Sequence, residues 1–222
     1  MNPAQSQPDN SSSPPQYSPT EERLNFYSHA VGLLLSVAAL VALLLRASAS
    51  GSTLVMVSFA LFGASLMILY GVSTLYHGAR SPLLRSRLRI ADHASIYVLI
   101  AGTYTPFTLI VLQGSIGWSL FAASWTMALT GIILKLFYTG RCRLLSTSLY
   151  VFMGWIILFA IGPLVAQLAA PGLTWAVAGG IAYTLGAILY SMRKLPLNHA
   201  IFHLFVLIGS SCHFVAVYFY IG

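Results

Sequence analysis

The chain ends in NHAIFHLFVLIGSSCHFVAVYFYIG, residues 198–222, and this stretch indicates its fold most clearly. It is mostly apolar after His203 and long enough to cross a bilayer as one helix, which needs about 20 residues. Residues four apart in a helix lie on one face, so His199 and His203 present two imidazole rings one turn apart. That spacing suits two ligands of one metal ion. The alternative is a pair of interfacial histidines that reach toward water.

The composition places the whole chain in the same environment as this stretch. Of its 222 residues, 58% are hydrophobic and 7% are charged, whereas about a quarter of residues are charged in a soluble domain. We therefore expect an integral membrane protein. The formal charge of +7 does not indicate a nucleic-acid partner, because the arginines lie in short segments between apolar runs, where membrane topology explains them.

The apolar runs divide into seven segments, each close to the length that spans a hydrocarbon core of about 30 Å. This pattern predicts an all-α membrane protein, a seven-transmembrane helix bundle with short connections and no second domain. The expected spans cover residues 26–46, 52–77, 91–113, 117–137, 144–168, 173–192 and 199–221.

The N-terminal residues differ in composition from the rest of the chain. Residues 1–20 are polar and rich in Pro, Ser, Gln and Asn, so we expect a disordered tail ahead of a helical domain at 21–222. The tail lacks the basic and apolar regions of a secretory signal. Order is expected to begin near Ser18, a good N-cap residue, because Pro19 follows and Glu21 completes a capping box.

The basic residues predict the orientation of the bundle. With the N-terminus on one side, that side receives ten of the eleven Lys and Arg residues, and the other side receives only Arg46. Loops rich in Lys and Arg face the cytoplasm, so the N-terminus is expected to be cytoplasmic and the C-terminus outside. The ten residues are Arg23, Arg80, Arg85, Arg87, Arg89, Lys135, Arg141, Arg143, Arg193 and Lys194.

This topology brings polar groups from three distant segments to one membrane depth. The second span ends on the cytoplasmic side at His77, with Ser73 one turn deeper on the same face. The third span opens on that side with Asp92, and the seventh opens there with His199 and His203. The five side chains are therefore candidates for one site.

Asp92 is the only carboxylate side chain after Glu22. A charged aspartate within a span costs a few kcal/mol or more unless it is paired or hydrated, which favours a functional role. The alternative is that Asp92 lies among the headgroups and pairs with Arg87 or Arg89.

The residue types at this depth match a zinc site. Zn²⁺ binds neutral imidazole nitrogens, and a catalytic zinc has three protein ligands and a water. His77, His199 and His203 are the candidate ligands, and a carboxylate such as Asp92 commonly orients a ligand or the water. Asn198 is a candidate N-cap of the seventh helix.

Two other histidines are expected to lie apart from the metal. His213 is ten residues beyond His203, which is about 15 Å along a helix, so we expect it to make a structural hydrogen bond. His93 is turned about 100° from Asp92 on a helix, so we expect it to face a neighbouring helix or the interface.

His29 lies near the same cytoplasmic surface, with Glu22 and Asn25 before it. The sequence leaves two roles open for these three residues, support of the metal ligands or a purely structural role.

Several further positions carry structural expectations. Pro106, within GTYTPF of the third span, is expected to kink its helix. The Gly and Ala residues at 178–180 are expected to allow close helix packing. Cys142 and Cys212, one in a loop and one within the bilayer, are expected to be free thiols.

At these residues the chain resembles the hemolysin III family, the bacterial branch of the progestin and adipoQ receptor proteins. The resemblance covers nearly everything from Glu22 to the C-terminus and rests on four motifs: Glu22 with Asn25 and His29, Ser73 through His77, Arg-Ile-Ala-Asp92 followed by GTYTPF, and HAIFH with a later His213. It implies seven transmembrane helices with a cytoplasmic N-terminus. It also implies a zinc ion held by His77, His199 and His203, with Asp92 close to its water. The pattern of Ser, Asp and three His is similar to that of alkaline ceramidases.

Three functions are compatible with these features. We expect first a zinc-dependent hydrolase of a lipid amide or ester in the bacterial inner membrane, with Asp92 as general base and Ser73 as hydrogen-bond donor. The second is a lipid sensor or membrane-homeostasis protein with structural zinc. The third is a cytolysin, as the family name suggests. We rank it last, because the sequence contains no soluble amphipathic segment that could form a pore. The sequence does not specify the oligomeric state.

Overall fold

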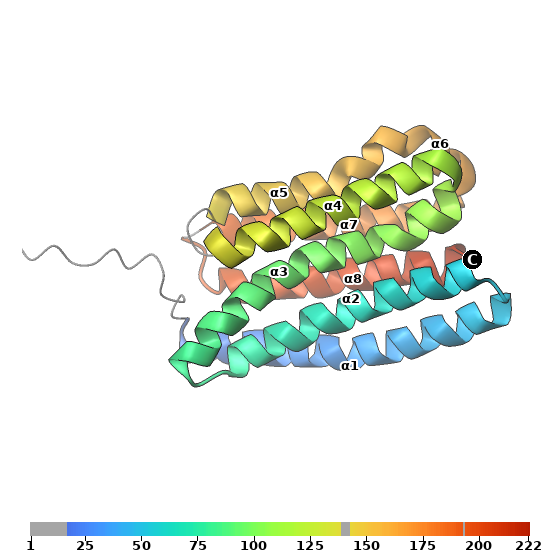
Figure 1. Cartoon of the computed structure of the whole chain (residues 1–222). Helices are drawn as coiled ribbons and strands as arrows, with labels where there is room; N and C mark the ends of the chain where they lie inside the picture. The colour runs from blue at the N-terminus through green and yellow to red at the C-terminus, as the bar shows by residue number, and fades with distance from the viewer. Residues whose placement is uncertain (1–16, 139–142, 193) are drawn as a thin grey trace, which may run out of the picture.

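Every predicted span is helical in the computed structural model of the chain, which describes residues 17–138, 143–192 and 194–222 (Figure 1). The seven-helix membrane fold expected from the sequence is thereby confirmed. The third span continues α3 with a π-helical segment, Phe107–Leu112, and a 3₁₀ segment, Ile156–Ala160, joins α5 to α6 within the fifth. The α-helices are α1 Pro19–Ser50, α2 Thr53–Gly78, α3 Pro82–Pro106, α4 Gly114–Tyr138, α5 Arg143–Trp155, α6 Ile161–Gln167, α7 Ala170–Ser191 and α8 Asn198–Tyr220.

The start of α1 follows the capping pattern in the sequence. Ser18 is the N-cap, and its hydroxyl accepts a hydrogen bond from the Glu21 amide at 3.2 Å, with Pro19 in the first turn. The helix begins within the stretch assigned to the polar tail, whose residues 1–16 lie outside the described part of the chain. Because α1 starts well before its apolar run, the polar residues of its first turns are held on a rigid helix.

The third helix also begins earlier than its apolar pattern. It starts at Pro82, and its first turns carry Arg85, Arg87 and Arg89, which are good helix formers although they are not apolar. Hydropathy locates only the membrane part of such a helix. Asp92 therefore does not open the helix but lies nearly three turns into it.

Two spans change their helical geometry at neighbouring places. α3 ends at Pro106 and continues as the π-helical segment, so the expected disturbance at this proline takes the form of a widened helix. The Tyr104 hydroxyl donates to the Gly154 carbonyl at 2.8 Å and accepts from the Ile157 amide at 3.1 Å. This hydroxyl thereby links the end of α3 to the break in the fifth span. The sequence did not predict that break.

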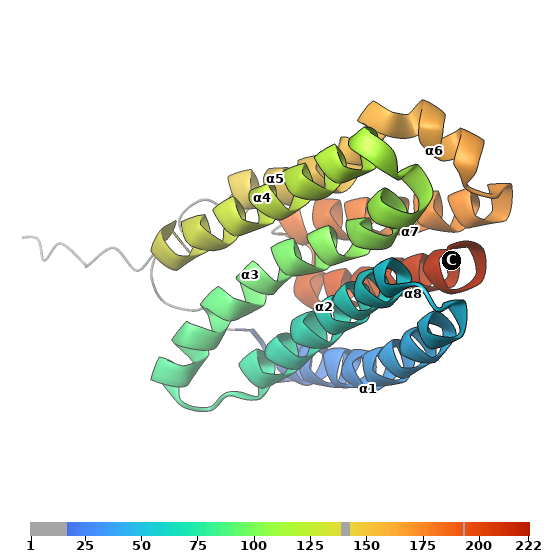
Figure 2. The same cartoon turned by 45° about the vertical axis from the view of Figure 1, so that its right-hand side comes forward.

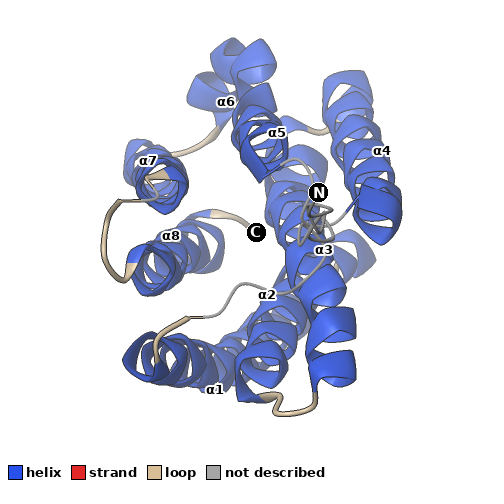
Figure 3. Ribbon diagram, turned by 90° about the vertical axis from the view of Figure 1, so that its left-hand side faces the viewer, coloured by secondary structure: helices blue, strands red, loops and turns tan. Residues whose placement is uncertain are grey.

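The helices form a bundle around an interior to which most of them contribute (Figures 2 and 3). α1 contacts α2 and α8, α2 contacts α3, and α7 packs between α8 and α5, while α4 lies against α3. Large apolar side chains such as Leu34, Phe137 and Phe159 are exposed on the outside. An apolar surface of this extent suits contact with lipid.

Close packing of α7 on α8 depends on Gly179. A Cβ atom at this position would lie 2.3 Å from Nδ1 of His213, closer than van der Waals contact allows. The expectation that this Gly and Ala segment permits close approach agrees with the structure. Cys212 is a free, buried thiol, and Cys142 lies outside the described residues.

Candidate metal centre

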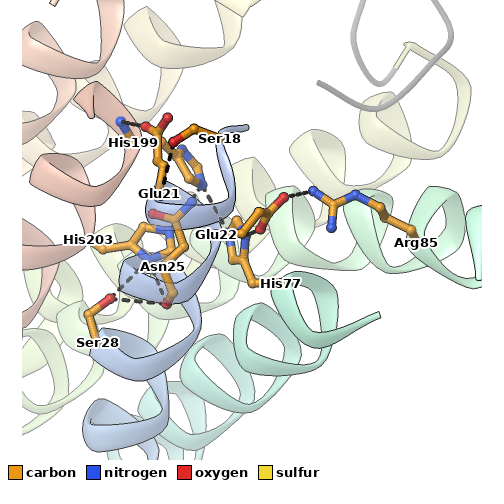
Figure 4. A network of polar contacts seen from close by, with 9 residues as sticks. All are labelled: Ser18, Glu21, Glu22, Asn25, Ser28, His77, Arg85, His199 and His203. Atoms are coloured by element: carbon orange, nitrogen blue, oxygen red, sulfur yellow. Dashed lines mark hydrogen bonds and ion pairs between the residues drawn. The ribbon is translucent and has the colours of Figure 1, made fainter. Parts of the chain in front are cut away.

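Three buried histidines meet at the end of the bundle where α1 begins (Figure 4). His77 comes from the last turn of α2, and His199 and His203 come from the first two turns of α8. Nε2 of His199 lies 3.2 Å from Nε2 of His77 and 3.1 Å from Nε2 of His203. One nitrogen from each ring lies within 4.8 Å of the others, so the three could hold a metal ion.

Hydrogen bonds on the far side of two rings set which nitrogen carries the proton. Nδ1 of His77 lies 2.8 Å from Oε2 of Glu22, and Nδ1 of His203 lies 3.3 Å from the Asn25 carbonyl. Carboxylate and carbonyl oxygens only accept, so both Nδ1 atoms donate and both Nε2 atoms carry lone pairs. These lone pairs converge on Nε2 of His199, an arrangement that a cation between the nitrogens would stabilise.

Two of the three distances between these nitrogens, those from His199 to His77 and to His203, are close to the distances in a zinc site. A tetrahedral Zn²⁺ with zinc–nitrogen bonds of about 2.0–2.1 Å holds its donor nitrogens about 3.3 Å apart, close to the contacts between the rings. Buried polar atoms without a hydrogen-bond partner among the described residues also occur on the adjacent helices: the Asn25 amide, both ring nitrogens of His29 and the Ser73 hydroxyl. Buried polar groups are usually satisfied, so their grouping here is consistent with a site that takes up ions or water.

Glu22 and Arg85 extend the site toward the start of α3. Glu22 Oε1 forms an ion pair with the Arg85 guanidinium while Oε2 accepts from His77. Glu21 contributes differently, because its Oε1 accepts from the backbone amide of His199 at 3.3 Å, at the N-terminus of α8. A carboxylate is stabilised at a helix N-terminus, so Glu21 supports the start of α8 through its backbone, whereas Glu22 contacts a ligand ring directly.

We predict that Glu22→Gln lowers the zinc affinity about 10- to 100-fold, because loss of a partner that orients a ligand commonly has this effect. The glutamine can still accept from His77 but carries no charge and loses the ion pair with Arg85. Competition with a chelating dye measures the affinity. Glu21→Gln is the matched control, since it alters a neighbouring carboxylate that contacts only backbone at the site; equal affinities in the two variants would refute this role for Glu22.

The metal centre borders a cavity of about 310 Å³. His199, His203 and Asp92 line it at one end, and it continues between apolar side chains such as Leu99 and Val206. Ligand pockets have volumes of about 300–1,000 Å³, so the space accommodates a small or single-chain ligand. The cavity connects the candidate ligands to Asp92, which the sequence placed at the same depth.

Asp92 is buried, and its Oδ2 lies 3.8 Å from Nδ1 of His93. A buried carboxylate in a cavity does not match the alternative of an aspartate exposed among the headgroups. His93, which was expected to face a neighbouring helix or the interface, lines the same cavity, and its Nδ1 donates to the Arg89 carbonyl at 2.8 Å. An angle of about 100° on one helix still lets two neighbouring side chains reach a wide cavity.

The other predicted residues fall around this centre at different distances. Ser73 is buried one turn before His77 but is not among the residues that line the cavity. The His29 ring stacks on His203, with centroids 3.5 Å apart and planes at 10°, and meets Tyr70 edge to face. Asn25 contributes its carbonyl, as described above. All of these residues except Ser73 touch a candidate ligand or the cavity.

His213 lies at the deep end of the cavity, where its Nδ1 donates to the Gly209 carbonyl at 2.8 Å. It makes the structural hydrogen bond that its spacing predicted. Asn198 does not act as the N-cap, which is Leu197 in a left-handed conformation. Its side-chain amide instead donates to the Tyr190 carbonyl at 3.1 Å, so this side chain contacts the last turn of α7.

Tyr17 was not predicted as part of the site. Its ring stacks on His199, with centroids 4.8 Å apart and planes at 16°, and it lies 5.9 Å from the His77 ring. It precedes the N-cap of α1, in a polar stretch whose composition indicates only disorder. No local pattern would have placed it over the histidines, since its position depends on where α1 meets α8.

The chain is similar to known proteins of one family. The family model described as "Haemolysin-III related" matches residues 17–214. The chain is 47% identical over 201 residues to "Hemolysin-3" of Bacillus cereus, which covers 90% of this chain and 92% of that protein. It is 46% identical over 200 residues to "Hemolysin-3 homolog" of Bacillus subtilis (strain 168), and the aligned region covers 90% of this chain and 94% of that protein. The human "Monocyte to macrophage differentiation factor" is 29% identical to this chain over 217 residues, and the aligned region covers 93% of this chain and 87% of that protein.

Proposed function

The chain belongs to the hemolysin III family, as its motifs predicted, and we propose that it is a zinc-dependent membrane hydrolase that cleaves an amide or ester bond of a lipid. The observation that carries this proposal is that His199, His203 and Asp92 line one cavity with a largely apolar continuation. Hydrolysis of a lipid by this mechanism needs a metal site, a carboxylate that acts as general base and a pocket for an acyl chain.

A bound zinc ion would polarise a carbonyl oxygen and make a water acidic enough to ionise near pH 7. In this proposal the other steps belong to side chains of the protein. The carboxylate of Asp92 accepts the proton of the attacking water as general base and then delivers it to the leaving group. Ser73 has no step in this proposal, because its hydroxyl makes no hydrogen bond to a candidate ligand and does not line the cavity, while the stacked ring of His29 restrains His203.

The proposed site of action is the cytoplasmic leaflet of a bacterial inner membrane. The support is the ten-to-one distribution of basic residues, which favours a cytoplasmic location for the end of the bundle that holds the histidines. An acyl chain would occupy the apolar part of the cavity, while the bond to be cleaved lies between Asp92 and the histidines.

A panel of long-chain amides and esters tests the proposal. The purified protein, reconstituted in lipid with zinc, is incubated with each compound, and products are identified by mass spectrometry. We expect release of the acyl chain from at least one compound, and none from the His203→Ala variant. A zinc-loaded protein that is inert across the panel would contradict the hydrolase, and ion leakage from protein-containing vesicles would instead support membrane lysis, the activity in the relatives' name.

A further inference from the structure

The end of the cavity far from the metal centre holds a hydrogen-bond acceptor on His213. This side chain is 9% exposed and lines the cavity, and its Nδ1 donates to the Gly209 carbonyl at 2.8 Å. An unpaired charge at a buried position is costly, so the ring is neutral and its Nε2 carries a lone pair. Within residues 17–138, 143–192 and 194–222, Nε2 has no hydrogen-bond partner. Buried polar groups usually have one.

Packing around the His213 ring fixes the direction of this lone pair. A Cβ atom at Gly179 would lie 2.3 Å from Nδ1 and 2.4 Å from Cε1, so that edge of the ring lies against α7. The Tyr183 ring stacks on one face, with centroids 5.4 Å apart and planes at 14°, and the Phe107 ring meets His213 edge to face at 6.2 Å. The edge that remains to border the cavity is the one that carries Nε2.

The hydroxyl groups that line this part of the cavity are already paired. They belong to Thr103, Tyr104, Tyr183 and Thr184. Thr103 donates to the Leu99 carbonyl at 2.8 Å, and Thr184 donates to the Gly180 carbonyl at 2.8 Å. The Tyr183 hydroxyl lies 2.9 Å from that of Ser210, and the Tyr104 hydroxyl makes the two bonds described above. The natural partner for Nε2 of His213 is therefore a donor on a ligand.

The helix that carries both ends of the cavity sets the distance between them. His213 follows His203 by ten residues, which is about 15 Å along α8. An extended chain advances about 1.2 Å per bond, since the three backbone bonds of one residue span at most about 3.3–3.6 Å. A group that reaches His213 is therefore about 13 bonds from one held at the metal centre.

We propose that the cavity binds an acyl chain with a hydroxyl group far from its head, and that His213 accepts the hydrogen bond of this hydroxyl. A plain chain would leave Nε2 without a partner, and a hydroxyl halfway along the chain would be buried among apolar side chains such as Leu99 and Val206. Both cases carry the cost of an unsatisfied polar group. This inference rests on the proposed function in that it names the acyl chain of the hydrolase's substrate.

Binding of two isomeric fatty acids to the zinc-reconstituted protein in phosphatidylcholine nanodiscs tests this inference. One is dodecanoate with a hydroxyl on its last carbon, the ω isomer, and the other is dodecanoate with a hydroxyl on its sixth carbon. The isomers have the same composition, and neither holds an amide or ester bond, so the result does not depend on hydrolysis. We expect the wild type to bind the ω isomer about tenfold more tightly, because only that hydroxyl reaches an acceptor.

Substitutions at the far end of the cavity identify the acceptor. His213→Leu should abolish the preference for the ω isomer and leave the binding of plain dodecanoate unchanged, which also reports that the cavity is intact. Thr103→Val is the matched control, because it removes a hydroxyl of the same part of the cavity that is already bonded to its own helix. This variant should keep the preference.

The wild-type comparison needs no variant, so it decides even if His213→Leu does not fold. The proposal is overturned if the wild type binds the isomers equally, if His213→Leu keeps the preference, or if Thr103→Val removes it. A preference for the ω isomer without hydrolysis of any amide or ester would count against the proposed function alone.

Discussion

Changing His203 to alanine will abolish zinc binding. Its Nε2 is 3.1 Å from that of His199, and its Nδ1 is committed to the Asn25 carbonyl, so the ring is oriented with its free lone pair toward the other ligands. A zinc site with three protein ligands that loses one retains two, too few for stable binding, and alanine leaves no donor in its place. We expect the zinc content to fall from one ion per chain to background.

The control is a second histidine on the same helix. His213→Gln changes a buried ring at the deep end of the cavity, far from the three nitrogens along the helix axis. Each variant is purified without chelators, dialysed and analysed for metal by mass spectrometry, and its thermal unfolding confirms that it folds. Zinc retained in full by the His203 variant, or lost equally from both, would show that His203 is not a ligand.

The second large effect is expected from Asp92→Asn. This change keeps the size and polarity of the side chain but removes a carboxylate that can accept a proton. We expect the turnover of a lipid substrate to fall about 10²- to 10⁴-fold, the usual contribution of a general base, while zinc stays bound. Turnover is measured on whichever compound of the lipid panel the wild type cleaves.

Glu21→Gln serves as the control for Asp92, since it removes a carboxylate at the same end of the bundle that does not line the cavity. Its turnover should stay near that of the wild type. Should Asp92→Asn cleave at the wild-type rate, another group is the base. If the Asp92→Asn variant loses zinc as well as activity, the carboxylate acts as a metal ligand and not as the general base.

The sequence predicts the fold well because each span is visible in a single segment. Seven runs of apolar residues and the short connections between them are local properties, and the N-cap at Ser18 was found in the same way. The limits of the third span were less accurate, since its helix continues through Arg85 to Pro82 and hydropathy does not register a helix that extends beyond the bilayer.

The site could be predicted in part. Helical spacing puts His199 and His203 on one face, and topology puts His77 and Asp92 at the same depth, but neither specifies how the helices rotate about their axes. The contacts that depend on that rotation were missed: the turn of Lys135 into the cavity, the ring of Tyr17 on His199 and the inward position of His93. Each of them depends on how distant segments of the chain pack together, and no single segment carries a signal for it.

X-ray absorption at the zinc edge, on the wild-type protein in lipid, tests the central claim most directly. The account predicts one zinc ion whose first shell holds three imidazole nitrogens and one further light atom from water, at about 2.0–2.1 Å. A protein that takes up no zinc, or a shell in which a fourth protein ligand replaces the water, would contradict an open catalytic site formed by His77, His199 and His203.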